Sequence, residues 1–218
     1  PSKLQGFTIR NGYGEDGYGG GGIKCFGSSP ILENLIIKDN NSYRGAGIGC
    51  SNNSLPVIRN TLITGNISTE SGGGIFISNG SSPTIVNVTI TKNESSSGTL
   101  FLSASTAQLT NVIVWGNLSP NSIRLWASSE IGIAYSNINN ILESGNNTQY
   151  PWDLGGNISI DPLFNDAVNN DFTLQEGSPC IDAGTADLDG DGTEDITDYS
   201  SSAPDMGAFE SNLPAPTG

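Results

Sequence analysis

Leu32-Glu-Asn-Leu-Ile-Ile37 is the clearest copy of a six-residue unit that recurs along the chain at intervals of 24 to 28 residues. Each copy begins with an apolar residue, usually has Asn at its third position, and ends in Ile or Val. The copies are Leu4-Gln-Gly-Phe-Thr-Ile9, Leu32-Glu-Asn-Leu-Ile-Ile37, Ile58-Arg-Asn-Thr-Leu-Ile63, Ile85-Val-Asn-Val-Thr-Ile90, Leu109-Thr-Asn-Val-Ile-Val114 and Ile133-Ala-Tyr-Ser-Asn-Ile138. Strand-length segments repeated at a nearly fixed period indicate a stacked solenoid.

A second strand accompanies each unit, at Ile23, Ile48, Ile75, Leu100 and Ile123. Because side chains alternate along a strand, Leu32 and Ile37 should face the interior and Ile36 the exterior. Parallel strands that stack about 4.8 Å apart in coils of this length form a parallel β-helix. We therefore predict an all-β solenoid, with its coils over residues 1–140.

Two columns of asparagine are expected to run along the stack. The first consists of Asn34, Asn60, Asn87 and Asn111, and the second of Asn40, Asn66, Asn93 and Asn117. Asparagine tolerates the left-handed backbone of a tight turn, and its amide can bond to the same amide one coil away. We interpret both columns as structural ladders rather than as ligand sites.

The charge divides the chain into two parts. Residues 1–140 hold all eight Lys and Arg and seven acids, whereas residues 141–218 hold fifteen acids and no base. We predict no nucleic-acid partner, because binding nucleic acid needs clustered Lys and Arg. No apolar run is long enough to span a membrane. We predict an acidic C-terminal cap over residues 141–212, which helps to close the rod, and a linker over residues 213–218.

Four motifs in the acidic part resemble those of a known family. They are Asp161-Pro-Leu-Phe164, Asp171-Phe-Thr-Leu174, Ser178-Pro-Cys-Ile-Asp-Ala-Gly184 and Asp205-Met-Gly-Ala-Phe-Glu210. The set resembles the C-terminal module of bacterial surface and secreted right-handed parallel β-helix proteins of the pectin-lyase-like superfamily. The upstream repeats are similar to the coils of that superfamily. The resemblance implies right-handed coils and an extracellular or cell-surface location.

A calcium loop is predicted over residues 187–198. Its spacing follows the EF-hand loop, whose ligands stand at positions 1, 3, 5, 7, 9 and 12 with Gly at position 6. Gly192 takes position 6, and no amphipathic helix flanks the loop. The predicted ligands are Asp187, Asp189, Asp191, the backbone carbonyl of Thr193, Asp195 and Asp198. Oxygen ligands at this spacing favour Ca²⁺ in a structural role, and a solvated acidic turn is the alternative.

Catalysis is not favoured by the residues of the coils. The superfamily includes polysaccharide-cleaving enzymes, but the chain has no His, which excludes Ser-His and Cys-His chemistry. The coil acids are scattered, and no two share a column in adjacent coils. We predict a non-catalytic extracellular protein with an adhesive or filament-forming role. The alternative is a carbohydrate-binding or polysaccharide-lyase-related fragment of a larger enzyme.

Outward-facing aromatic residues supply a candidate contact surface. Phe76 and Phe101 should share one outward column, and alternation also turns Trp115 and Trp126 outward. Aligned exposed rings can stack on sugars. The predicted partners are a cell-surface glycan and a second copy of the chain, joined end to end. The alternative is that a loop or the C-terminal module covers these columns, including the apolar column Ile36, Leu62, Thr89 and Ile113.

The number of cysteines does not show whether the protein works in an oxidising or a reducing compartment. Cys25 and Cys50 occupy the same interior column in successive repeats, at a spacing compatible with either inert packing or a disulfide. Cys180 lies outside that pair.

Overall fold

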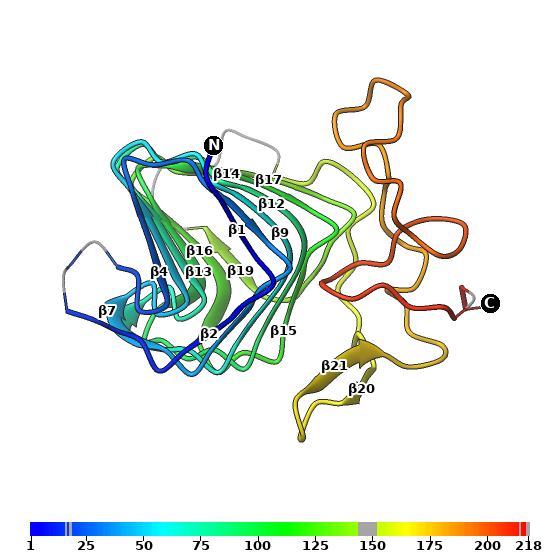
Figure 1. Cartoon of the computed structure of the whole chain (residues 1–218), viewed down its shortest axis with the longest axis horizontal. Coiled ribbons are helices and arrows are strands. Elements are labelled where there is room, and N and C mark those ends of the chain that lie inside the picture. Colours follow the sequence, from blue (N-terminus) through cyan, green and yellow to red (C-terminus); the bar gives the residue numbers. More distant parts are fainter. Residues whose placement is uncertain (16, 18, 144–151, 214, 217–218) are drawn as a thin grey trace.

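The chain folds as a stack of parallel β-coils beside an irregular C-terminal segment (Figure 1). The computed structural model describes residues 1–15, 17, 19–143, 152–213 and 215–216, and these contain strands and turns but no helix. The strands form a β-solenoid of about five turns, so the predicted all-β solenoid is confirmed. In the described part of the chain, no helix has the length and hydropathy needed to cross a membrane.

The largest sheet contains the recurring six-residue units. Its strands are β1 (Lys3–Gln5), β2 (Thr8–Arg10), β5 (Ile31–Glu33), β6 (Ile36–Lys38), β9 (Val57–Thr64), β12 (Thr84–Thr91), β14 (Thr106–Thr110), β15 (Ile113–Trp115), β17 (Glu130–Ala134) and β18 (Asn137–Ile138). A turn at the third residue of the unit divides the contribution of four coils into two short strands, whereas β9 and β12 run through it as single strands of eight residues.

Three further sheets complete the described architecture. One stacks β4 (Ile23–Phe26), β8 (Ile48–Ser51), β11 (Ile75–Ser78), β13 (Gly98–Ser103), β16 (Asn121–Trp126) and β19 (Ile141–Glu143). A narrow sheet consists of β3 (Tyr13–Gly14), β7 (Asn41–Arg44) and β10 (Ile67–Ser71). The C-terminal segment adds the antiparallel pair β20 (Phe164–Asp166) and β21 (Asp171–Leu174).

Strand register stacks equivalent residues directly over one another. The first position of the unit forms the continuous column Leu4, Leu32, Ile58, Ile85, Leu109 and Ile133. The interior positions of the later strands are closed to solvent, as Ile37, Ile63 and Ile90 show. Burial of these branched side chains is the main favourable contribution to folding, at about 25 cal/mol per Å² of apolar area.

Left-handed turns occur where the sequence places asparagine. Asn34, Asn60, Asn87 and Asn111 have φ angles of 52°, 49°, 52° and 56°. The first and last copies of the unit hold Gly6 and Tyr135 there, with φ angles of 76° and 47°. The left-handed turn therefore occurs in every coil, even where the residue at this position is not asparagine.

Parallel stacking continues beyond residue 140. Strand β19 pairs in register with β16, and isolated parallel bridges join Ile133 to Asp153 and Asn137 to Ile158. Trp152 packs against the interior core cluster. The segment from Trp152 to Ile158 thus extends the last coil over the end of the stack. The boundary at residue 140 stays a prediction.

That the acidic cap as a whole helps to close the rod stays a prediction. The rest of the acidic segment lies against the side of the stack (Figure 1). The physical reason is the apolar outward column on the largest sheet. Met206 and Ile181 pack with Ile113 in a second cluster, and Ala208 N donates to Thr89 Oγ1 at 2.9 Å. Thr89 and Ile113 are consequently buried. Leu62 in the same column is also buried, while Ile36 is exposed.

Candidate functional site

A groove lies on the outer face of the sheet that contains β11, β13 and β16. Register places Lys24, Gly49, Phe76, Phe101 and Arg124 in one outward column. The groove has a volume of about 460 Å³. It is lined by Arg44, Glu70, Ser71, Phe76, Ser96, Ser97, Phe101, Ser103, Arg124 and Trp126.

Six planar side chains form a continuous stack, which we call the aromatic–arginine stripe; five of them line this groove, and the sixth, Tyr43, lines the neighbouring hollow. In order they are Tyr43, Arg44, Phe76, Phe101, Arg124 and Trp126. Arg44 Cζ lies 5.3 Å from the centroid of the Tyr43 ring and 5.4 Å from that of Phe76. The Phe76 and Phe101 rings are stacked, with centroids 5.8 Å apart. Arg124 Cζ lies 6.0 Å from Phe101 and 5.8 Å from Trp126. Cations at these distances are attracted to the ring faces.

Exposure differs between the ends of the stripe and its middle. Tyr43 and Trp126 are 47% and 50% exposed, whereas Phe76 is only 3% exposed. Phe76 does point outward, but backbone covers it. A Cβ added to Gly45 or Gly72 would lie 2.9 or 2.8 Å from the Phe76 Cβ, so both glycines are needed for this close approach. Phe76 therefore lines the groove with little exposed surface, whereas Phe101 is half-buried and Trp126 is the most exposed ring of the predicted set in the groove.

Arg44 is held by an acid on the next coil. Its Nε and Nη2 donate to the two carboxylate oxygens of Glu70 at 2.6 and 2.8 Å. This bidentate pair raises the pKa of Arg44, against an opposing contribution from desolvation, and lowers that of Glu70. Both groups therefore stay charged across the ordinary pH range, and each neutralises the other.

Arg124 has no such partner. Its Nη1 donates to Ser97 Oγ at 2.7 Å. The buried Nε has no hydrogen-bond partner, and no acid of the described residues pairs with this guanidinium. Among the residues that the structure describes, Arg44 is thus paired with an acid in the groove and Arg124 is not.

Tyr43, Arg44 and Glu70 were not predicted as parts of the site. A signal was present, because Arg44 and Glu70 are 26 residues apart, which is one coil period. Residues separated by one period in a solenoid lie on neighbouring coils. Trp115, in contrast, was predicted for the surface and lies elsewhere, packed against the cluster that joins the C-terminal segment to the stack.

Both asparagine columns form hydrogen-bonded ladders. In the first, Asn87 Nδ2 donates to Asn60 Oδ1 at 3.2 Å and Asn111 Nδ2 donates to Asn87 Oδ1 at 3.0 Å. In the second, amide bonds run from Asn40 to Asn66, from Asn66 to Asn93 and from Asn93 to Asn117, at 2.9, 2.9 and 3.2 Å. Asn34, at the start of the first column, shares the same turn. These contacts fit a structural role.

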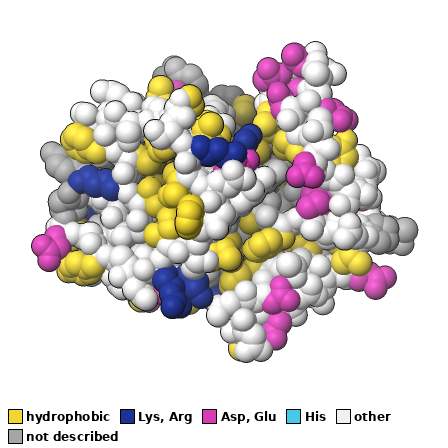
Figure 2. Space-filling model, viewed as in Figure 1, with side chains coloured by type: hydrophobic (Ala, Val, Ile, Leu, Met, Phe, Trp, Pro, Cys, Tyr) yellow, Lys and Arg dark blue, Asp and Glu magenta, His cyan; other side chains and the backbone are white. Residues whose placement is uncertain are grey.

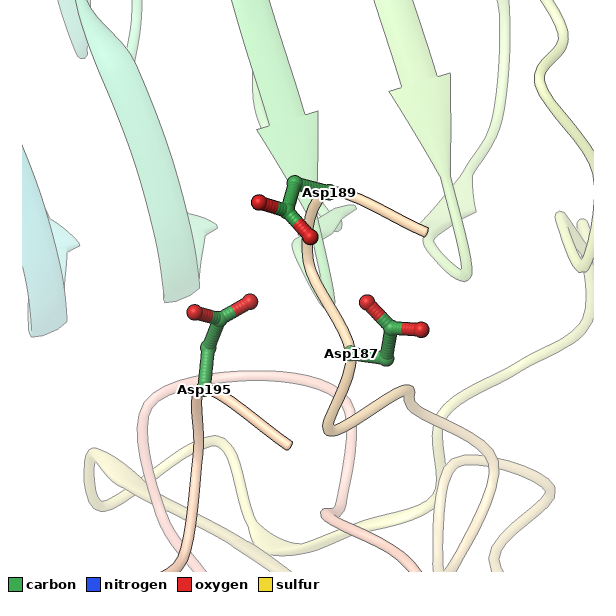
Figure 3. A group of neighbouring side chains, drawn as sticks. All are labelled: Asp187, Asp189 and Asp195. Atoms are coloured by element: carbon green, nitrogen blue, oxygen red, sulfur yellow. The ribbon is translucent and has the colours of Figure 1, made fainter. Parts of the chain in front are cut away.

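Three carboxylates of the acidic loop converge (Figure 3). One oxygen from each of Asp187, Asp189 and Asp195 lies within 4.8 Å of the others. Gly190 N and Gly192 N donate to the Asp187 carboxylate at 2.8 and 2.9 Å. These backbone bonds, that from Gly192 most strongly, lower the pKa of Asp187 and keep it ionised. Three carboxylate oxygens at this spacing suit a hard divalent cation.

The other predicted ligands lie outside this group of three. Asp191 Oδ1 accepts a bond from Thr193 N at 2.7 Å, which closes a small turn. Asp198 lines a separate hollow with Asn34, Asn60 and Asn87. The loop therefore assembles positions 1, 3 and 9 of the predicted set.

Acidic side chains over the coils are dispersed. Glu33 pairs with Lys3 and with Arg59 Nη2, the latter at 2.9 Å. Figure 2 shows the visible Lys and Arg side chains over the coils and most of the visible acids over the C-terminal segment. Among the described residues that line the groove, Glu70 is the carboxylate, and it is committed to Arg44.

Stacked parallel coils with internal ladders define the chain as a parallel β-solenoid. Residues 2–112, just over half of the chain, match the model of the family described as the right-handed beta helix region. The chain therefore belongs to the right-handed β-helix family. No curated protein and no solved structure matches it. Family membership establishes the fold and its hand, whereas enzymes and non-enzymes share this fold.

Proposed function

We propose that this domain is a non-catalytic, extracellular surface module that binds glycans in the groove of the aromatic–arginine stripe. The single observation that carries the proposal is the unbroken stack from Tyr43 to Trp126, which is exposed at both ends. The ring faces at the two exposed ends suit the apolar faces of sugars, because the faces inside the stack are covered by their neighbours. The serine hydroxyls along the groove supply hydrogen-bonding groups between the rings.

The direction of the stripe suits a chain-like ligand. The stripe crosses neighbouring coils instead of following one strand, from the coil of β8 to the coil of β16. Three steps of about 4.8 Å span roughly 14 Å. A groove of about 460 Å³ lies within the range of about 300–1,000 Å³ for small-molecule sites. The dimensions favour an oligosaccharide that lies along the stack over a single sugar.

The pairing of the charged groups in the groove favours a binding role over catalysis. Acid–base cleavage of a glycosidic bond needs two carboxyl groups on either side of it. Glu70 is engaged in two hydrogen bonds with Arg44, so its carboxylate is occupied as an acceptor. Arg124 and Ser97 can instead hold a ligand without breaking it.

Calcium in the acidic loop is the second part of the proposal. It is supported by the three convergent carboxylates and by the sequence spacing around Gly192. The role would be to stabilise the C-terminal segment, because the ion relieves the repulsion between Asp187, Asp189 and Asp195. End-to-end association of copies stays a prediction, which light scattering at high concentration tests.

A glycan array with the labelled full chain tests the main proposal. We expect binding to a subset of oligosaccharides, with no release of shorter products when the bound glycans are analysed. Binding to no glycan would contradict the adhesive role. Cleavage of the bound glycan would contradict the non-catalytic part and leave the site in place.

A further inference from the structure

Two thiols face each other across neighbouring coils. Cys25 on β4 and Cys50 on β8 are register partners, and they are 1% and 0% exposed. Parallel strands are about 4.8 Å apart, which lies inside the range of about 4.4–6.8 Å between the Cα atoms of a disulfide. Both side chains point inward from equivalent positions, so their Cα–Cβ directions do not diverge.

The two thiols lie in an otherwise apolar interior column. The same column continues with Ile77, Leu102 and Leu125, which are apolar. The neighbouring Cys50 thiol lowers the pKa of Cys25 against the effect of burial, whereas Cys25 and burial both raise the pKa of Cys50. Cys25 lies on β4, which pairs with β8 alone among the described strands, so its sulfur is the easier of the two to reach.

We propose that Cys25 and Cys50 form an intrachain disulfide when the protein meets a low-molecular-weight disulfide such as oxidised glutathione. The bond fastens strand β4 to strand β8. Cys180 remains a thiol, because it lies in the separate cluster that contains Met206 and Ile181. This inference is independent of the proposed glycan site.

The reaction balances as two thiol–disulfide exchanges. The Cys25 thiolate attacks one sulfur of oxidised glutathione, breaks its S–S bond, and releases one glutathione thiolate. Cys50 then loses its proton to solvent and attacks the Cys25 sulfur of the mixed disulfide. The second glutathione leaves as a thiolate. The two protein thiols lose two electrons and two protons, and one oxidised glutathione becomes two reduced molecules.

Access to the pair comes from the position of β4. Among the described strands, β4 pairs with β8 alone, whereas β8 also pairs with β11. Local opening of β4 therefore breaks one ladder only, and such edge elements open at a lower free-energy cost than strands paired on both sides. The bond would suppress this opening, since it closes a loop of about one coil in the unfolded chain.

Mass spectrometry of the full chain tests the proposal. The protein is purified with reductant, equilibrated with oxidised and reduced glutathione, denatured, and alkylated with iodoacetamide without further reduction. We expect one alkylated cysteine, Cys180, and a linked pair of peptides that contain Cys25 and Cys50. Three alkylated cysteines, a bond to Cys180, or stable glutathione adducts on Cys25 or Cys50 would overturn it.

Thermal unfolding gives a second readout with a matched control. We expect oxidation to raise Tm of the wild-type protein by roughly 5 °C. Cys180→Ala should keep this rise, and Cys25→Ala and Cys50→Ala should lose it. If the two variants fail to fold, peptide mapping of the wild-type protein still decides the question. A rise of the same size in Cys25→Ala would contradict the proposal.

Discussion

Asn111 and Thr185 exchange two hydrogen bonds between the coil stack and the C-terminal segment. Asn111 Nδ2 donates to Thr185 O at 2.9 Å, and Thr185 N donates to Asn111 Oδ1 at 2.8 Å. The same Asn111 amide donates to Asn87, so the first ladder ends on the segment that lies beside it. Thr185 stands just before the acidic loop, which is thereby anchored to the stack.

Asn111→Ala should therefore loosen the C-terminal segment without unfolding the coils. It leaves a backbone donor and a backbone acceptor of Thr185 without partners, at a cost of about 1–3 kcal/mol. Hydrogen exchange should accelerate around residues 180–185 and 204–208. Asn60→Ala is the matched control, because Asn60 has a similar φ of 49° but lies in the middle of the ladder. Equal acceleration in both variants would contradict the anchoring role.

Trp126→Ala should weaken binding to any glycan found on the array. The exposed ring supplies a stacking face at one end of the groove, and its loss should raise Kd roughly fivefold to tenfold. Isothermal titration calorimetry measures the change. Phe7→Ala is the control, since Phe7 is also an exposed aromatic residue but lies outside the residues that line the groove. Unchanged affinity in Trp126→Ala would place the ligand elsewhere.

Calcium should raise the melting temperature of the wild-type protein relative to the same protein in chelator. Asp189→Asn together with Asp195→Asn should abolish that rise, because two of three convergent carboxylates lose their charge. Glu176→Gln removes one charge of the same segment outside the loop and should keep the response. Differential scanning calorimetry is the measurement, and identical melting of the wild-type protein in both buffers would remove the calcium proposal.

Glu33 should stabilise the fold at neutral pH and lose that effect in acid. Its hydrogen bond with Lys3 lowers its pKa, desolvation opposes this, and the charge of Arg59 lowers the pKa further. A carboxyl whose folded pKa lies below the unfolded value of about 4.3 contributes stability above that value, and loses it as the pH falls through the folded pKa. Glu33→Gln should therefore melt below the wild-type protein at pH 7, and the gap should close as the pH falls below about 4.3 and through the folded pKa of Glu33. A gap independent of pH would contradict the assignment.

Cys180 should resist thiol reagents in the native protein. Burial raises its pKa to about 11, although hydrogen bonds from Asn137 and Ser178 oppose the shift. At neutral pH almost no thiolate is present, and the sulfur is closed to solvent. Labelling with iodoacetamide followed by peptide mapping should show modification of Cys180 only after denaturant is added. Rapid labelling of the native protein would show that the C-terminal segment opens readily.

The sequence was sufficient to predict the coils but not what covers them. Stacking of Ile37 over Ile63 follows from spacing alone, because a period close to one coil places equivalent residues on neighbouring strands. The burial of Phe76 was not predictable in this way, since it depends on the path of the backbone at Gly45 and Gly72. Packing of Met206 against Ile113 likewise joins segments that share no periodic relation. The repeat in the sequence therefore predicts which residues of neighbouring coils stack. It does not predict which segments outside the repeat pack over the coils.

Because neighbouring coils stack without an offset in register, the number of coils sets the length of the rod. Strands β9 and β12 match residue for residue from Val57 opposite Thr84 to Thr64 opposite Thr91, apart from the turn asparagines. A duplicated coil would therefore meet the same contacts above and below, and the rod would grow by one strand spacing. The attachment at Thr89 and Asn111 limits where such an insertion fits. Coils added ahead of Val57 would leave that junction untouched, so gene duplication there could lengthen the molecule without redesigning it.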